Sequence, residues 1–371
     1  MSILPSALLL PQRTLSKKGA VLRLAHEAAE FGAHGLIVHG RSLQRSGKLD
    51  AILNESPPGM TVRAWCHTEG GEPTVGAVET LRTELRANRP DWVAAIGGGS
   101  VIDLAKAAAG LVDAQESVAF YQLNNAALPS ATLPLVAAPS TAGTGSEATV
   151  VSVLTDPEHT LKQSIRHPSH MPRLVILDPD LLKGCPPATI AAAGLDAFIQ
   201  AFESYISRHA TPFTRALAEL ALVRISHTLL PLFRGNHDNA AADMLEASYL
   251  AGLAFSHSRL GVIHGLAHPL GARFGVAHGL VCACCLPACL AFNSPTVSCD
   301  LNALKRQHGI DVEARVAMWL SAMRLENPFA GQRVADRDAF IHETLISGST
   351  AANPRPVTAD DVAMLLDAVM K

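Results

Sequence analysis

The chain has 371 residues, enough for two domains or one large one. Its hydrophobic content of 48% supplies material for a sizeable core, and its formal net charge of -3 gives no reason to expect nucleic acid or an anionic membrane as a partner. No uninterrupted apolar run reaches the roughly 18–20 residues of a membrane span, and the short apolar piece at 7–10 lacks the preceding basic residues of a signal peptide.

The first half of the chain alternates short apolar runs with helical patterns. Strands are predicted over residues 35–38, 91–96, 133–138 and 174–177, and helices over 22–30, 77–87 and 101–111. This alternation predicts an α/β domain with a parallel, Rossmann-like sheet that is covered by helices on both faces. Ligands of such sheets bind at the carboxyl ends of the strands, which directs attention to the loops that follow them.

Two glycine-rich loops follow predicted strands. The first is Gly97, Gly98, Gly99 and Ser100, and the second is the hydroxyl-rich segment 139–147. Glycines let the backbone approach a ligand closely, and the N-terminus of a following helix offers free N–H groups to a phosphate. Two such loops at the ends of two parallel strands predict a dinucleotide site, although tight turns without a ligand can have the same composition.

From Pro186 onward, Ala/Leu-rich helical patterns replace the strand patterns. Helices are predicted over residues 188–207, 213–232, 240–255, 315–323 and 359–370, with a loop over 327–337. We therefore expect a dinucleotide-binding α/β domain over residues 1–185 and an all-helical domain over residues 186–371. The cleft between two such domains is the expected place for a site.

Three histidines lie close together in the second half. His264 and His268 are four apart and share one face of a helix. Pro269 and Gly271 weaken that helix, so that a short irregular segment can bring His278 back toward the same face. Three imidazoles that meet there suit a divalent metal of the zinc or iron kind, whereas any one of them alone is better explained as an ordinary polar position near a helix end.

A carboxylate that can join these histidines lies on the first predicted helix of the second half. Asp196 and Gln200 are four apart on one face of this Ala/Leu/Phe-rich helix, with Glu203 nearby. A carboxylate in such surroundings is costly to bury unless it is paired or bound to a metal. With His264 and His278, Asp196 makes three protein ligands and leaves a coordination position open, as a catalytic metal requires. Taken alone, Asp196 is better explained as a capped or paired surface carboxylate.

Seven cysteines, an odd number in a long chain, argue against a disulfide framework and favour a reducing, cytoplasmic compartment. Four are crowded at Cys282, Cys284, Cys285 and Cys289, without the spacing of a paired Cys-x-x-Cys zinc site. Since Cys282, Cys285 and Cys289 share a helical face with Val, Leu and Ala, we interpret them as part of a buried apolar face.

Several motifs together resemble those of the iron-containing (group III) alcohol dehydrogenases, and the match covers essentially the whole chain. They are GGGSVIDLAKA (97–107), PSTAGTGSEAT (139–149), Lys162 six residues before Pro168, VILDP (175–179), GLDAFIQAFESY (194–205), HGLAHPLGA (264–272), HG (278–279) and NPRP (353–356). The resemblance implies the dehydroquinate synthase-like architecture of an α/β domain followed by a helical one. It also implies hydride transfer between NAD(P)(H) and a small alcohol or aldehyde, one divalent metal, Fe²⁺ or Zn²⁺, and at least a homodimer.

The resemblance assigns roles residue by residue. The cofactor would be bound at its pyrophosphate by the first glycine-rich loop, with Asp103 also at the cofactor, and near the nicotinamide by Ser140, Thr141, Thr144 and Lys162. The metal ligands would be Asp196, position 200, His264 and His278. His268 would lie close to substrate and nicotinamide, where it would help to relay the proton to solvent.

Position 200 departs from the family, which usually has histidine where this chain has Gln200. An amide oxygen is a weak, neutral ligand. Either the site keeps three strong ligands, as in the related glycerol dehydrogenases and dehydroquinate synthases, or the metal is held loosely. The substitution makes Zn²⁺ more credible relative to tightly bound Fe²⁺.

The end of the strand at 35–38 is a second departure. Members that prefer NAD carry an aspartate there for the adenosine ribose, whereas this chain has Gly40 followed by Arg41. Without the carboxylate, and with a guanidinium nearby, a 2′-phosphate can be accepted. The sequence therefore favours NADP(H) over NAD(H).

The segment 255–260 is a third departure and concerns the substrate. His257 falls on one helical stripe with His264 and His268, but about 10 Å along the axis from His264, so we expect it to line the pocket and not to ligate the same ion. Arg259 or Arg273 would then meet an anionic substrate. An Arg259 that is simply solvated at the rim explains the sequence equally well.

Three other functions stay open. A metal-free reductase resembling maleylacetate reductase is disfavoured because that family lacks the aspartates matching Asp103 and Asp196, although Gln200 and the arginines keep it in view. A lyase of the dehydroquinate synthase type is disfavoured by the motif at 139–149. The third is a catalytically silent dinucleotide-binding protein whose metal site has decayed at position 200.

Overall fold

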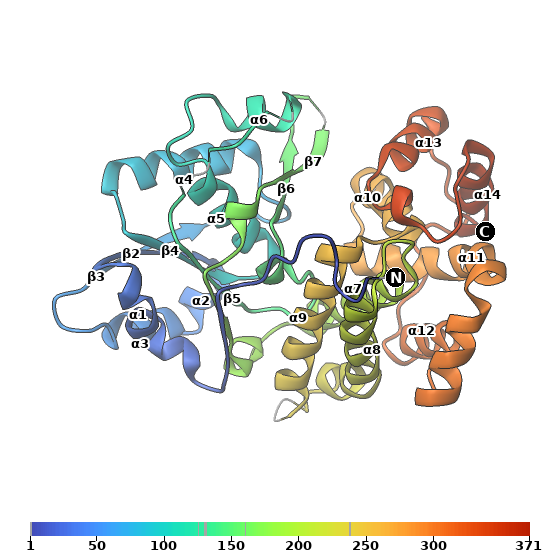
Figure 1. Ribbon diagram of the computed structural model, residues 1–371, viewed down its shortest axis with the longest axis horizontal. Helices are drawn as coiled ribbons and strands as arrows, with labels where there is room; N and C mark the ends of the chain where they lie inside the picture. Colours follow the sequence, from blue (N-terminus) through green and yellow to red (C-terminus); the bar gives the residue numbers. More distant parts are fainter. Residues whose placement is uncertain (1, 125, 130–131, 160, 237–238) are drawn as a thin grey trace. The chain divides into compact units, whose positions relative to one another are not determined.

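The computed structural model describes residues 2–124, 126–129, 132–159 and 161–236 and residues 239–371 (Figure 1). They form two compact units. One is the α/β unit Leu9–Gly184, and the other is the helical unit, Cys185–Lys371 together with the N-terminal residues up to Leu8. This division differs from the expected α/β domain over 1–185, because the N-terminal residues attach to helices: the backbone N–H of Phe213 donates to the Ile3 carbonyl at 3.1 Å.

The α/β unit is built on a six-stranded sheet in which every described pairing is parallel, as predicted. In spatial order the strands are β1 (Arg13–Ser16), β8 (Leu174–Leu177), β5 (Leu135–Pro139), β4 (Trp92–Gly97), β2 (His34–Gly40) and β3 (Thr61–His67). The four inner strands are the predicted ones. The sequence analysis did not predict the two edge strands, whose residues are largely exposed or half-buried.

Helices cover both faces of this sheet. They are α1 (Leu24–Ala28), α2 (Arg41–Arg45), α3 (Lys48–Asn54), α4 (Val75–Asn88), α5 (Gly99–Gly110) and α6 (Val118–Asn124). Successive residues of β4 alternate between two hydrophobic clusters: Val93 packs with α4 and α5, whereas Trp92 and Ala94 pack with α1 and α3. A hairpin of β6 (Val151–Asp156) and β7 (Leu161–Arg166), which the sequence analysis did not predict, is antiparallel and separate from the sheet.

The helical unit contains the predicted helices and three more. They are α7 (Pro187–Ile206), α8 (Pro212–Phe233), α9 (Ala240–Ser258), α10 (Val262–Phe274), α11 (His278–His308), α12 (Val312–Ala322), α13 (Arg337–Ile346) and α14 (Ala359–Val369). Of these, α10 corrects an expectation, because Pro269 and Gly271 lie inside it and do not end it. A proline removes a single backbone donor, and here the helix continues to Gly275, whose φ of 65° terminates it.

Two helices, α8 and α11, are long and apolar enough to cross a membrane by length and composition alone, a property that the search for uninterrupted apolar runs did not detect. Core helices of globular proteins meet the same criteria. In this structure α8 packs against α7 and α9, and α11 packs against α7 and α10. Their apolar character therefore has an explanation within the helical unit.

Candidate functional site

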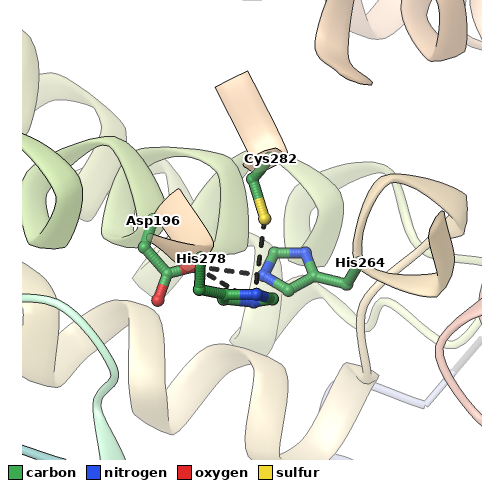
Figure 2. Close-up of side chains that lie close together, drawn as sticks. All are labelled: Asp196, His264, His278 and Cys282. Atoms are coloured by element: carbon green, nitrogen blue, oxygen red, sulfur yellow. Dashed lines mark hydrogen bonds and ion pairs between the residues drawn. The ribbon is translucent and has the colours of Figure 1, made fainter. Parts of the chain in front are cut away.

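Four side chains converge within the helical unit (Figure 2). They are Asp196 of α7, His264 of α10, and His278 and Cys282 of the first turn of α11, and we call them the Asp196 cluster. Their potential ligand atoms all lie within 4.8 Å of one another. The Asp196 Oδ1 atom is 3.2 Å from His264 Nε2 and 3.8 Å from His278 Nε2. The structure thus brings together the three side chains that the sequence predicted as strong ligands.

Close packing of two helices places His278 over Asp196. A Cβ atom at Gly279 would overlap the carbonyl oxygen of Ala192 on α7, so only glycine lets α11 begin this close to α7. The helix α10 stops at Gly275, and only three residues, Gly275 to Ala277, separate it from His278. The predicted short connection after the first two histidines is therefore present, although it begins later than expected.

The start of α10 is fixed by a buried carboxylate. Glu203 Oε1 accepts the backbone N–H of Ile263 at 2.7 Å, and Oε2 accepts the Nδ1–H of His264 at 2.6 Å. Gly261 leaves the necessary space, since a Cβ there would lie 2.6 Å from Glu203 Oε1. In a neutral imidazole, an Nδ1–H donated to Glu203 would leave the lone pair of His264 on Nε2, which faces Asp196. The sequence analysis noted Glu203 only as a neighbour of Asp196.

The charges of this region favour a cation. The side chains of Asp196 and Glu203 are 6% and 2% exposed, and a buried carboxylate is costly unless a positive charge accompanies it. Burial by itself lowers the pKa of His264, but the neighbouring Cys282, Asp196 and Glu203 outweigh it and raise that pKa well above 6.5. A protonated imidazole or a metal ion would each compensate the negative charge of these carboxylates. The ligand set of carboxylate, imidazoles and thiol is one that divalent metals accept.

Gln200 lies one turn after Asp196 and is bound to it. Its Nε2 donates to Asp196 Oδ2 at 2.9 Å, which fixes the carboxylate with Oδ1 toward the histidines. Its Oε1 is buried and has no hydrogen-bond partner among the described residues. Gln200 therefore positions Asp196, and its carbonyl oxygen is a further candidate donor.

His268 joins the histidines as predicted. Its ring stacks on His278 with centroids 4.9 Å apart and an interplanar angle of 20°, and its centroid lies 6.3 Å from that of His264. The i, i+4 spacing on α10 produces this arrangement. The expected proton relay through His268 stays a prediction.

In the α/β unit, the two glycine-rich loops lie side by side at the carboxyl ends of β4 and β5. Gly97 accepts the backbone N–H of Ser140 at 2.8 Å, and a Cβ at Gly99 would lie 2.6 Å from Thr144 Oγ1. Gly98 is the N-cap of α5 and supplies no capping side chain, while its carbonyl accepts the N–H of Val101 at 3.1 Å, so a ligand would meet the N–H groups of Gly99 and Ser100 first. The two loops and the N-terminus of α5 thus form a glycine-lined cradle, and binding of a pyrophosphate there stays a prediction.

Asp103 connects α5 to the second glycine-rich loop. Its buried carboxylate accepts the hydroxyl of Ser146 and the backbone N–H of Val153, and Oδ1 lies 3.8 Å from Lys106 Nζ. Lys106 in turn donates to the Ser146 carbonyl at 2.7 Å. Asp103 thereby ties α5 to the second loop and to β6, and its described contacts are those of a positioning residue.

The remaining predicted cofactor residues lie on the same unit. Ser100 and Thr141 are half-buried, Thr144 is exposed, Gly40 is the N-cap of α2, and Arg41 begins that helix with an exposed side chain. Lys162 of β7 forms an ion pair of 2.6 Å with Glu72. A cofactor contact of Lys162 therefore competes with this carboxylate.

Comparison with known proteins decides the family. The model of the iron-containing alcohol dehydrogenases matches residues 11–179, and the model of the C-terminal domain of the same family matches residues 190–370. The chain belongs to the iron-containing alcohol dehydrogenase family. It is accordingly an oxidoreductase of the NAD(P)-dependent alcohol dehydrogenase class.

Individual members of the family are similar over most of the chain. The probable alcohol dehydrogenase EutG of Escherichia coli is 38% identical over 76% of this chain and 72% of its own length, and the lactaldehyde reductase of Escherichia coli is 31% identical over 94% and 95%. Among solved structures, the sulfoacetaldehyde reductase of Bifidobacterium kashiwanohense in complex with NAD+ has a TM-score of 0.91 at 26% identity, covering 98% of both chains. The iron-containing alcohol dehydrogenase of Thermococcus thioreducens has a TM-score of 0.88 at 27% identity, covering 98% and 99%.

In this alcohol dehydrogenase, the position of Cys282 differs from the interpretation of the cysteine-rich segment as an apolar face alone. Cys285 and Cys289 are fully buried, and burial raises the pKa of each thiol well above 9.0, as expected for an apolar face. Cys282 is equally buried, but its Sγ lies 3.7 Å from His278 Nε2. Its i, i+4 spacing from His278 was the signal available in the sequence.

The expected stripe of His257, His264 and His268 is wrong. Arg259, with a φ of 62°, ends α9 at Ser258, and α10 begins only at Val262, so the histidines lie on separate helices. His257 Nδ1 is bonded to the Leu253 carbonyl of its own helix at 2.8 Å. No single helical face joins these three positions.

The two candidate substrate arginines differ. Both terminal nitrogens of Arg273 donate to the carboxylate of Glu343, each at 2.7 Å, so its guanidinium is engaged within the helical unit and the expected role with an anionic substrate is disfavoured. Arg259 is exposed. Burial, followed by the charges of Arg259 and Arg208, lowers the pKa of His209, which indicates that Arg259 lies near that histidine.

Proposed function

We propose that this alcohol dehydrogenase is metal-dependent and transfers a hydride between a nicotinamide cofactor and a small alcohol or aldehyde. The observation that carries the proposal is the convergence of Asp196, His264 and His278 in a buried cluster. Two separate observations support it: the carboxylate that fixes the His264 tautomer, and the unpartnered Gln200 Oε1 beside Asp196.

When bound, the metal supplies Lewis-acid polarisation of a carbonyl, and the nicotinamide supplies or accepts the hydride. The chain supplies positions and charge. Asp196 and His278 would bind the metal, and His264 would bind it through Nε2, because Glu203 holds the proton on Nδ1. The first glycine-rich loop and the N-terminus of α5 would hold the pyrophosphate of the cofactor. His268, stacked on His278, moves the substrate proton between the site and solvent.

We further propose a preference for NADP(H). Gly40 ends β2 without a carboxylate, and the exposed side chain of Arg41 follows at the N-terminus of α2. A guanidinium there suits the 2′-phosphate of NADP(H). The ratio of kcat/KM for NADPH to that for NADH, with the Arg41→Ala variant as comparison, measures the preference.

The proposed substrate, cellular location and oligomeric state rest on the named relatives and on the composition of the chain. Two similar proteins are named for small aldehydes, lactaldehyde and sulfoacetaldehyde. Of the two aldehydes, sulfoacetaldehyde carries a sulfonate group. We propose a small aldehyde, neutral or anionic, as substrate, with no nucleic acid or membrane partner. The seven free cysteines fit a cytoplasmic location, and by analogy with relatives we propose a homodimer or a higher homo-oligomer.

Metal analysis of the purified protein, combined with removal and restoration of the metal, tests the proposal. We expect close to one Zn²⁺ or Fe²⁺ per chain, loss of NADPH-dependent reduction of short aldehydes after chelation, and recovery after the metal is added back. Full activity after complete metal removal would favour a metal-free reductase resembling maleylacetate reductase. Metal binding with no turnover of any aldehyde would favour a silent dinucleotide-binding protein.

A further inference from the structure

We propose that Cys282 is a metal ligand of this protein, so that a thiolate from α11 replaces the histidine that family members usually have at position 200. The inference rests on the proposed metal dependence and adds the identity of the fourth ligand. It also predicts a preference for zinc.

The distances within the Asp196 cluster have the size of a coordination shell. Metal bonds of about 2.0–2.3 Å at tetrahedral angles separate the ligand atoms by about 3.3–3.6 Å. The structure has 3.2 Å from Asp196 Oδ1 to His264 Nε2, 3.8 Å from Asp196 Oδ1 to His278 Nε2, and 3.7 Å from His278 Nε2 to Cys282 Sγ. These three edges lie within about half an ångström of the tetrahedral values, and all the separations among the four ligand atoms stay within 4.8 Å.

The backbone fixes this position of the thiol. His278 and Cys282 are four apart on the first turn of α11, so their side chains share one face. Figure 2 shows the Sγ atom of Cys282 pointing down toward the imidazoles of His264 and His278, with the Asp196 carboxylate to their left. Gly279 holds this turn against α7, which places the thiol and the Asp196 carboxylate in one cluster.

The chemistry of the donors favours the thiol over the amide at position 200. The Gln200 amide is neutral, and its Nε2 is already bonded to Asp196. A Cys282 thiolate and the Asp196 carboxylate, both buried, together carry two negative charges, which match the charge of a divalent ion. Soft thiolate ligands select zinc over the harder divalent ions, and zinc sites with four ligands can expand to five, so the thiolate does not close the site to substrate.

X-ray absorption of the zinc-loaded holoenzyme tests the inference without any variant. We expect one sulfur scatterer at about 2.3 Å together with nitrogen and oxygen scatterers. In the Co²⁺-loaded protein the same ligation produces a near-ultraviolet charge-transfer band from sulfur to cobalt. One zinc per chain with only nitrogen and oxygen scatterers overturns the inference and leaves the proposed function standing, whereas a protein that binds no metal overturns both.

Variants locate the sulfur. Cys282→Ala should remove the sulfur scatterer and the cobalt band and weaken zinc affinity by at least about 100-fold. Cys285→Ala, which removes a buried thiol of the same helix outside the cluster, is the matched control and should change none of these. The double variant Cys282→Ala with Gln200→His restores a nitrogen donor, and we expect metal content to recover without the cobalt band. A Cys282→Ala protein that retains the sulfur signal contradicts the inference.

Discussion

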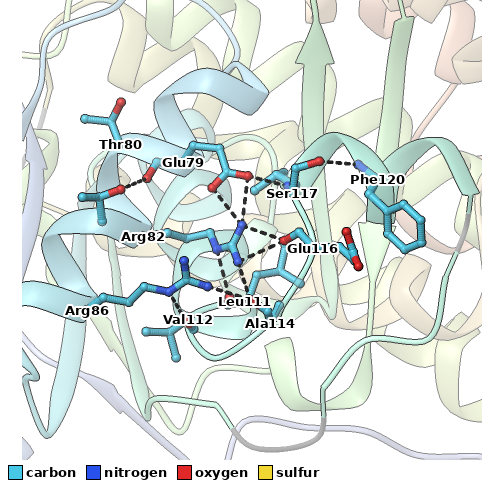
Figure 3. A network of polar contacts seen from close by, with 12 residues as sticks. Glu79, Thr80, Arg82, Arg86, Leu111, Val112, Ala114, Glu116, Ser117 and Phe120 are labelled. Carbon is cyan, nitrogen blue, oxygen red and sulfur yellow. Dashed lines mark hydrogen bonds and ion pairs between the residues drawn. The ribbon is translucent and has the colours of Figure 1, made fainter.

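The α/β unit and the helical unit each contain a buried charged side chain, and the partners of the two side chains differ in kind. In the α/β unit, every guanidinium nitrogen of Arg82 donates: to the Leu111, Ala114 and Glu116 carbonyls and to Glu79 (Figure 3). In the helical unit, Asp196 faces imidazole nitrogens and a thiol at distances of a coordination shell, beside an amide oxygen without a described partner. A complete hydrogen-bond network stabilises a fold. Potential metal ligands that converge beside an unpartnered oxygen instead indicate a binding site.

Removing one donor from the Asp196 cluster gives the largest expected effect. In His264→Ala, metal content and turnover should be lost together, with kcat/KM lower by on the order of 10³-fold, because several kcal/mol of charge stabilisation depend on the ion. His342→Ala, an exposed histidine of α13, is the control. Retention of full turnover by His264→Ala would end the metal hypothesis.

Breaking the Arg82 network should act on stability alone. Arg82→Met removes the guanidinium from Glu79 and from three carbonyl oxygens, of which Glu79 keeps the N–H of Val118 and Ala114 keeps Arg86, and we expect the free energy of unfolding to fall by about 3–5 kcal/mol. Denaturant titration measures this, and metal stoichiometry should stay at the wild-type value. Loss of metal in the folded Arg82→Met protein would contradict the separation between the two regions.

Glu203 tests whether the tautomer of His264 matters. Glu203→Gln keeps the shape of the side chain and an oxygen for the N–H of Ile263, but it removes the charge that holds the Nδ1–H of His264. Metal affinity should fall by about 10–100-fold. Isothermal titration with zinc measures it, and an unchanged affinity would show that the histidine orients itself without Glu203.

The smallest effect concerns a buried carboxyl of the α/β unit. Burial raises the pKa of Glu147 from 4.5 to about 7, so the folded state holds this proton more tightly than the unfolded state. The stabilisation is therefore fully present below pH 4.5 and is lost as the pH rises through about 7. Relative to Glu147→Gln, the wild type should lose about 1 kcal/mol between about pH 6 and pH 7. Parallel pH profiles for the two proteins would contradict this assignment.

The sheet shows which strands a sequence can reveal. β2, β4, β5 and β8 are covered on both faces, and burial on both faces produces the continuous apolar runs that were predicted. β1 and β3 lie at the edges, and their exposed positions interrupt any such run. The inner sheet was predictable for the same physical reason that its edges were not.

The site was predictable in part. The spacing of His264, His268 and His278 and the acid at Asp196 indicated a metal cluster, because the chemistry of ligands constrains residue types. The place of Cys282 was not evident, because the helical face through Cys282, Cys285 and Cys289 was not extended back to His278, where α11 begins. The stripe through His257 failed because Arg259 adopts a positive φ, which is rare for this residue type.

His278 and Cys282 occupy one helical turn, so the two donors behave as a bidentate chelate built into the backbone. An ion held by both must leave when that turn unravels, and it keeps the turn wound while it stays. The rate of zinc loss to a strong chelator therefore reports the local opening of the N-terminus of α11. Amide hydrogen exchange in this turn should slow on metal binding in parallel with the retention of zinc.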